Sequence, residues 1–109
     1  MGIDARSFLW FGTRPVSRLF PSYADQEALE RQLEPHGLVL VGVHYPEADS
    51  LYAIAIKACY HRNSWDDDFK KLSLTLPTPE QLQALADHAG LLVPEAPEFG
   101  WYQASTLSL

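Results

Sequence analysis

The chain has 109 residues and a formal net charge of −6, because its 14 Asp and Glu outnumber its 8 Lys and Arg. A chain of this length corresponds to one domain, so we expect residues 1–109 to form a single α+β domain without a cleft between two lobes. The 47% hydrophobic and 20% charged fractions are those of a chain that folds. The acidic balance argues against direct nucleic-acid binding, because phosphate contacts require a basic surface.

No segment of the sequence has the features of a membrane span or an export signal. The longest apolar runs, residues 8–11 and 38–43, are far shorter than the ~20 residues that cross a bilayer. The first residues also lack the basic and then apolar pattern of a signal peptide. We therefore expect a cytoplasmic protein with no membrane partner. Cys59 is the one cysteine, so it forms no disulfide within the chain and is expected to be a small buried side chain.

The first elements in chain order are a strand and a connection. Residues 7–13 are rich in aromatic side chains and are followed by Pro15, which favours a strand over a helix. Residues 14–22 mix prolines, serines and arginines without a period, which is typical of a connection.

A helix is predicted to begin after Ser22. Ser22 and Asp25 form the start of a capping-box-like pattern, and apolar residues then recur at the helical period. The helix should end near Glu34, because Pro35 disfavours helical geometry in the preceding residue. Gly37 can adopt the left-handed conformation that closes a helix.

A hairpin is predicted from residues 38–45 and 51–61, with a turn over 46–50. Side chains alternate between the two faces of a strand, so each strand has a core face. We assign the valines of the first strand to the same core face as the even-numbered residues of the second. This core face comprises Val39, Val41, Val43, Tyr45, Tyr52, Ile54, Ile56, Ala58 and Tyr60, and the opposite face comprises Gly42, His44, Lys57, Cys59 and His61.

The second half of the chain predicts a short element, a helix and a last strand. Ser64 can cap a short helix, although the alternating leucines of residues 71–76 equally favour a strand. A second main helix follows, with Thr78 as cap, Pro79 in its first turn, Gln81 completing a capping box and Gly90 as terminator. Aromatic and β-forming residues at 99–107 predict the final strand.

This order predicts a ferredoxin-like βαββαβ sandwich, with a mainly antiparallel sheet, helices on one face and an extra short helix or strand before the second main helix. Phe8 and Trp10 share one face of the first strand, and Leu9 and Phe11 share the other. We therefore expect one aromatic pair to point away from the helices, and a homodimer to bury that open face of the sheet.

The sequence predicts no metal site and no cofactor. The four histidines show no helical or strand spacing typical of metal ligands. Asp66, Asp67 and Asp68 lack the alternating ligands and glycine of a calcium loop, and they suit the first turn of a helix. His36, Cys59 and His61 could meet at one end of the hairpin, with ordinary polar strand-end residues as the competing interpretation.

Two candidate sites remain. Arg14, Arg18 and Ser22 lie beside the start of the first helix, where an anion could bind, although two loop arginines can equally be solvated or paired with acidic residues. A second candidate is a pocket between the sheet and the helices, with His44 or Arg14 as its polar group. That pocket would be lined by Tyr45, Tyr52, Tyr60 and Trp101.

No residue spacing typical of a catalytic site appears, which favours a non-enzymatic role. The first hypothesis is a small interaction or regulatory module that acts as a homodimer. The second is a small cofactor-independent enzyme, or a protein that binds a small anion or other ligand. The third is an acidic inhibitor of a nucleic-acid-binding protein, which would capture a basic protein partner.

Overall fold

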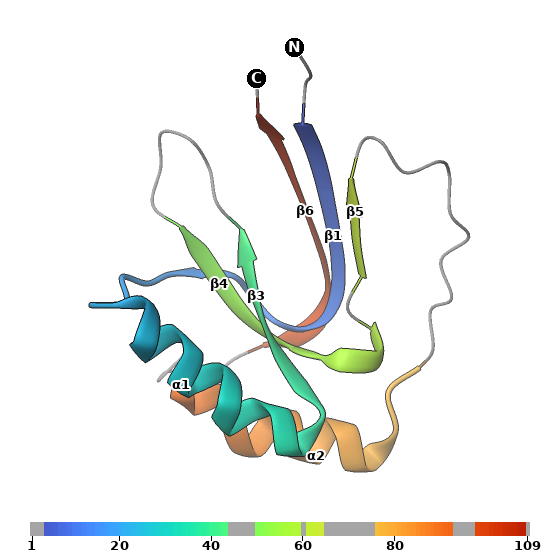
Figure 1. Cartoon of the computed structure of the whole chain (residues 1–109). Helices are drawn as coiled ribbons and strands as arrows, with labels where there is room; N and C mark the ends of the chain where they lie inside the picture. The colour runs from blue at the N-terminus through green and yellow to red at the C-terminus, as the bar shows by residue number, and fades with distance from the viewer. Residues whose placement is uncertain (1–3, 44–49, 60, 65–75, 93–97, 109) are drawn as a thin grey trace.

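A computed structural model describes residues 4–43, 50–59, 61–64, 76–92 and 98–108. Six strands and two α-helices follow one another along the chain, with short 3-10 turns η1 (Glu34–His36), η2 (Lys57–Cys59) and η3 (Ala89–Leu91) between them (Figure 1). In order, the main elements are β1 (Asp4–Thr13), β2 (Val16–Ser17), α1 (Tyr23–Leu33), β3 (Leu38–Val43), β4 (Leu51–Ile56), β5 (His61–Ser64), α2 (Pro79–His88) and β6 (Phe99–Ser108).

Both helices begin where their sequences predict, and α1 ends just before Glu34 as expected, but α2 ends at His88 and the predicted terminator Gly90 lies inside η3 without a positive φ. Ser22 caps α1, and Gly37 takes a left-handed conformation at φ 69° after η1. In α2, Thr78 and Gln81 form a complete capping box, in which the Thr78 hydroxyl accepts from the Gln81 amide and the Gln81 side chain accepts from the Thr78 amide. Pro79 occupies the first turn, as expected. These local signals therefore fix where each helix begins, and Gly37 closes the turn that follows α1.

The strands form one antiparallel sheet. β6 pairs with β1 along ten residue pairs, from Asp4 opposite Ser108 to Thr13 opposite Phe99. On its other edge β1 pairs with β5 and, at Gly12 opposite Ala55, with β4. β4 in turn pairs with β2 and β3. Both helices lie along one side of the sheet, while β1, β5 and β6 extend away from the helices (Figure 1).

The hairpin of β3 and β4 has a different arrangement of faces from the one predicted. Leu40 lies opposite Ile54, and Val41 lies opposite Ala53. Directly opposed residues share a face, so the β3 valines face away from Tyr52, Ile54 and Ile56. The assignment of the valines to the same face as Tyr52 was therefore wrong by one residue. Both faces of this hairpin are apolar, so alternation alone could not fix which residues are paired.

The predicted second strand of the hairpin, residues 51–61, is interrupted. β4 ends at Ile56, η2 covers Lys57–Cys59, and β5 begins at His61. Ala58 is consequently exposed rather than part of the core face, and Cys59 is buried in the cluster beneath the helices. This turn has no Gly or Pro, so the sequence contains no conventional break signal there.

Two apolar clusters cover the two faces of the sheet. The first includes Leu33, Ile54 and Leu85 and lies between the sheet and the helices. The second lies on the opposite face and joins Phe8 and Trp10 of β1 to Val41 and Val43 of β3, with Ala53 and Ala55 of β4. Phe8 and Trp10 are thus buried within one chain. The expected exposed aromatic pair is therefore not formed by Phe8 and Trp10, because the sheet curls over these side chains, and a homodimer through this face stays a prediction.

Gly12 permits that curl. A Cβ at this position would overlap the backbone carbonyl oxygen of Ile54 and lie 2.7 Å from the Cα of Ala55. Only a residue without a side chain lets β1 approach β4 this closely. The fold is accordingly α+β, with an antiparallel curled sheet and two helices. The proposed short helix after Ser64 and most of the alternative strand over 71–76 fall outside the described residues.

Candidate functional site

A cleft of about 410 Å³ opens where β2, the start of α1 and the start of β4 meet. The pairing of Val16 with Tyr52 and of Ser17 with Leu51 brings these segments together. The cleft combines aromatic, aliphatic and uncharged polar side chains with one guanidinium. Its lining residues are Ser17, Arg18, Leu19, Phe20, Ser22, Tyr23, Gln26, Ser50 and Tyr52.

Tyr52 and Phe20 form the apolar base of the cleft. Tyr52 is only 6% exposed and belongs to the cluster beneath the helices. The Phe20 ring meets the Tyr52 ring edge to face, with the centroids 4.9 Å apart. The Tyr52 hydroxyl donates to Oε1 of Gln26 on α1 at 3.4 Å. The base of the cleft is therefore anchored in the main core, which makes it a fixed surface rather than a loosely packed loop.

The rim of the cleft is apolar and exposed. Leu19 is 91% exposed and Tyr23 is 70% exposed. Both lie at the entrance to α1, beside the half-buried ring of Phe20 and the buried ring of Tyr52. Isolated exposed leucines are common on protein surfaces, but apolar side chains gathered around a concavity are typical of a binding site. The arrangement offers a contact surface for an apolar group.

Arg18 is held in place at the side of the cleft. Its Nη1 donates to the backbone carbonyl of Leu91 in η3 at 3.2 Å. Its guanidinium carbon lies 5.2 Å from the centroid of the Phe20 ring, within the range of a cation–π contact. Arg18 thus joins the loop before α1 to the end of α2. It is the one charged side chain among the residues that line the cleft.

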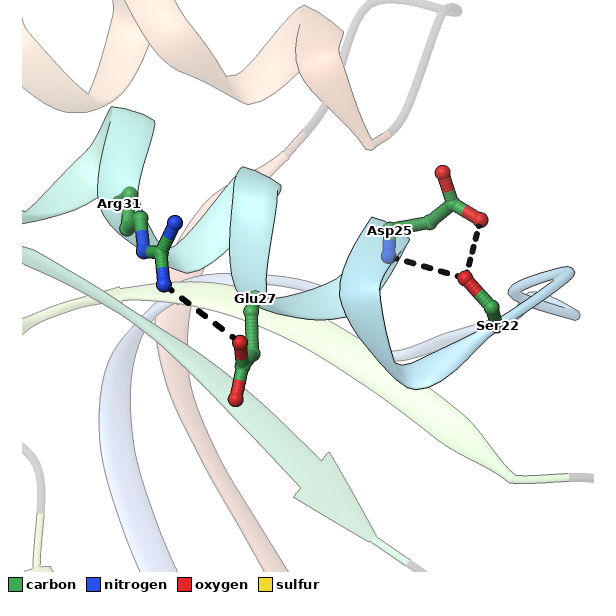
Figure 2. Close-up of polar contacts among 4 residues, drawn as sticks. All are labelled: Ser22, Asp25, Glu27 and Arg31. Atoms are coloured by element: carbon green, nitrogen blue, oxygen red, sulfur yellow. Dashed lines mark hydrogen bonds and ion pairs between the residues drawn. The ribbon is translucent and has the colours of Figure 1, made fainter.

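The start of α1 is capped by its own residues (Figure 2). The Ser22 hydroxyl donates to Oδ2 of Asp25 at 2.8 Å, and Ser22 Oγ accepts from the Asp25 amide at 3.4 Å. One turn further along, Arg31 lies 3.6 Å from Glu27. The Asp25 carboxylate already occupies the end of the helix that would attract an anion. An anion bound there would have to compete with it.

The structure places the predicted site residues in several different locations. Arg18, Ser22 and Tyr52 line the same cleft, whereas the exposed Arg14 does not. Trp101 lies on β6, where its ring makes an edge contact with Phe11 at 5.4 Å, and it is not part of the cleft. His44, Tyr45 and Tyr60 are outside the described residues.

Sequence reasoning missed Leu19, Phe20, Tyr23, Gln26 and Ser50 as lining residues. One signal was available for two of them, because Leu19 and Phe20 are adjacent apolar residues within a connection in which Val16 is the only other apolar residue besides the prolines. Nothing local to Ser50 or Gln26 indicates a site. They join the cleft only through the pairing of β2 with β4 and the packing of α1 on the sheet.

A histidine pair lies at the other end of the helix layer. The rings of His36 and His88 lie with their centroids 3.9 Å apart and their planes tilted by 32°, and Nδ1 of His88 is 2.8 Å from the carbonyl oxygen of Ala84. His36 therefore lies beside α2, and Cys59 is buried in the main cluster. Across the portion of the chain that is described, no three His, Cys, Asp or Glu side chains gather as a metal ion would require.

Neither α1 nor α2, nor any other described helix, is both long and apolar enough to cross a membrane. The sequence matches no protein-family model and has no significant match among curated proteins or solved structures. The cleft and its surroundings are therefore the basis of the functional argument.

Proposed function

We propose that this protein is a small interaction module of the ferredoxin-like type, in which β1 with β2 and β4 with β5 each act as one interrupted strand. The neighbour order β6, β1, β4, β3, with antiparallel pairing throughout, supports this interpretation. The fold alone assigns no activity, so the function is argued from the cleft. A cytoplasmic location remains a prediction.

The observation that carries the proposal is the exposed apolar rim above a rigid aromatic base. Leu19 and Tyr23 contribute large exposed surfaces, and Tyr52 and Phe20 provide a packed base. Tyrosine and arginine are among the residues that contribute most at protein interfaces, and interface anchors fill well-packed pockets. An apolar side chain of a partner protein inserted beside Tyr52 would cover surface that is otherwise exposed to water.

The charges around the cleft indicate which residues should flank the apolar anchor of the partner. α1 begins at the cleft and carries Asp25, Glu27 and Glu30, which outnumber Arg31 on the same helix and Arg18 in the cleft. A basic segment is attracted to such a helix, and the attraction raises the rate of association. The proposed partner is therefore a protein segment with an apolar anchor between lysines or arginines. A basic partner is also what the acidic composition of the chain predicts.

The test is a titration of the isotope-labelled protein, followed by amide chemical shifts. The probe is a synthetic peptide with one tryptophan between lysines, compared with the same peptide carrying glutamates in place of the lysines. The lysine peptide should shift the amides of Ser17, Arg18, Leu19, Phe20, Ser22, Tyr23, Gln26 and Tyr52, and the shifts should weaken with added salt. A titration with a free aromatic amino acid tests whether the cleft binds a small ligand as well as it binds a peptide.

Two results would overturn the proposal. One is an absence of shifts at millimolar lysine peptide, and the other is a set of shifts that maps away from the cleft. Equal or stronger binding of the glutamate peptide would contradict the assignment of a basic partner. Equally tight binding of the free amino acid would make the site one for a small ligand instead.

A further inference from the structure

No strand among the described residues pairs with the outer edge of β6. β1 covers one edge of β6 along the full ten residue pairs. No other described strand pairs with β6, so its second edge presents unpaired backbone amides and carbonyls. A row of such groups is a template for another strand, and natural proteins usually protect it.

β6 lacks the protections that charged side chains, proline and short length provide. Residues 99–108 contain no Lys, Arg, Asp, Glu or Pro. Charged side chains, prolines and very short length are the common ways in which an edge strand avoids pairing with another molecule. At ten residues β6 is also longer than an average strand. An uncharged edge of this length is suited to strand addition.

Three other described strands also have one partner each. β2 and β5 are only two and four residues long, and the longer β3 is less suited to pairing with a copy of itself. β3 has six residues and packs beside α1, which carries three carboxylates and one guanidinium. Two copies joined at β3 would bring two acidic helices close together, and like charges at short range are unfavourable. β6 is the better candidate for that reason.

The placement of β6 keeps the acidic helices of two copies apart. Phe99, at the start of β6, packs on the cluster beneath the helices, and the strand then runs away from them (Figure 1). Antiparallel pairing of two β6 strands puts the helix layers at opposite ends of the joint sheet. Ten residues at ~3.4 Å each span about 30 Å, well beyond the Debye length of about 8 Å at physiological salt.

We propose that β6 pairs antiparallel with β6 of a second copy of this chain, forming one sheet that is continuous across a two-fold homodimer. The contact uses the edge of the sheet and leaves the buried cluster around Trp10 unchanged. It is independent of the cleft, which lies at β2 and α1. Symmetric pairing of this kind is isologous and closes at two copies.

The test is sedimentation equilibrium of the full chain and of two matched variants. Gln103 is exposed near the middle of β6, and Gln103→Lys would place two ammonium groups near the two-fold axis. Gln32→Lys makes the same charge change at an exposed position on α1. The wild type and Gln32→Lys should dimerise, and Gln103→Lys should weaken the dimer by at least about tenfold.

Hydrogen exchange of the β6 amides provides a second measurement. In the dimer, alternate β6 amides that face away from β1 should gain protection as protein concentration rises. The proposal is overturned if the wild type is a monomer at high concentration. It is equally overturned if Gln103→Lys dimerises as tightly as Gln32→Lys while both variants keep the wild-type circular dichroism.

Discussion

The hydroxyl oxygen of Thr13 accepts a hydrogen bond from the backbone amide of Ile54 at 2.9 Å. Thr13 is the last residue of β1 and is fully buried. Its own carbonyl accepts from Nε1 of Trp10 at 3.1 Å. Thr13 therefore holds β4 beside β1 and also fixes the Trp10 indole at the centre of the second cluster. These two hydrogen bonds keep the curled sheet closed over its own side chains.

Replacing this hydroxyl should destabilise the fold. Thr13→Val keeps the shape of the side chain but leaves the buried Ile54 amide without its acceptor, at a cost of about 1–3 kcal/mol. Thr13→Ser, which keeps the hydroxyl, is the matched control for hydrogen bonding. Urea denaturation of the three proteins measures the difference. A free energy of unfolding for Thr13→Val equal to that of the wild type would contradict this role.

The close approach of β1 to β4 predicts a large effect at Gly12. In Gly12→Ala the new methyl group would meet backbone atoms of Ile54 and Ala55, which cannot rotate away as a side chain could. We expect a loss at or above the upper end of the about 1–3 kcal/mol typical of overpacking. Gly100→Ala, where an added Cβ meets no atom within 4 Å, should change stability by less than about 0.5 kcal/mol. Equal thermal midpoints for the two variants would refute the argument.

The two described tryptophan side chains should differ in their contribution to stability. Trp10 is fully buried and stacks on Tyr102 with ring centroids 6.0 Å apart, whereas Trp101 is 39% exposed. Trp10→Ala should cost about 3–5 kcal/mol, a large part of the stability of a domain of this size. Trp101→Ala should cost clearly less. Guanidinium denaturation tests both, and similar losses would show that the second cluster does not support the fold as described.

The helix limits could be predicted from sequence because their signals are local. Ser22, Thr78 and Gly37 act through hydrogen bonds or dihedral angles within a few residues of their own position. The pairing of strands is a long-range property. The register of β3 against β4 could not be fixed by alternation, because Leu40 and Val41 are equally suited to a core face.

The curl of the sheet and the cleft depended on contacts between distant segments. Gly12, within an aromatic strand, was the one local sign of a close backbone approach, and its partner was 42 residues away at Ile54. Arg18, Ser22 and Tyr52 were predicted as members of two separate sites, yet the pairing of β2 with β4 unites them in one cleft. The exposure of Leu19 follows from tertiary packing and has no sequence signal.

The central claim is that the apolar rim of the cleft binds a basic segment with an apolar anchor. The most direct measurement is the affinity of a fluorescent lysine-flanked tryptophan peptide for the wild type, Leu19→Ser and Leu76→Ser. Leu76 is 86% exposed and does not line the cleft, so it matches the 91% exposed Leu19 in residue type and exposure. We predict that Leu19→Ser weakens binding about tenfold, the equivalent of about 1.4 kcal/mol, and that Leu76→Ser leaves it unchanged. Equal affinities for the two variants would contradict the claim.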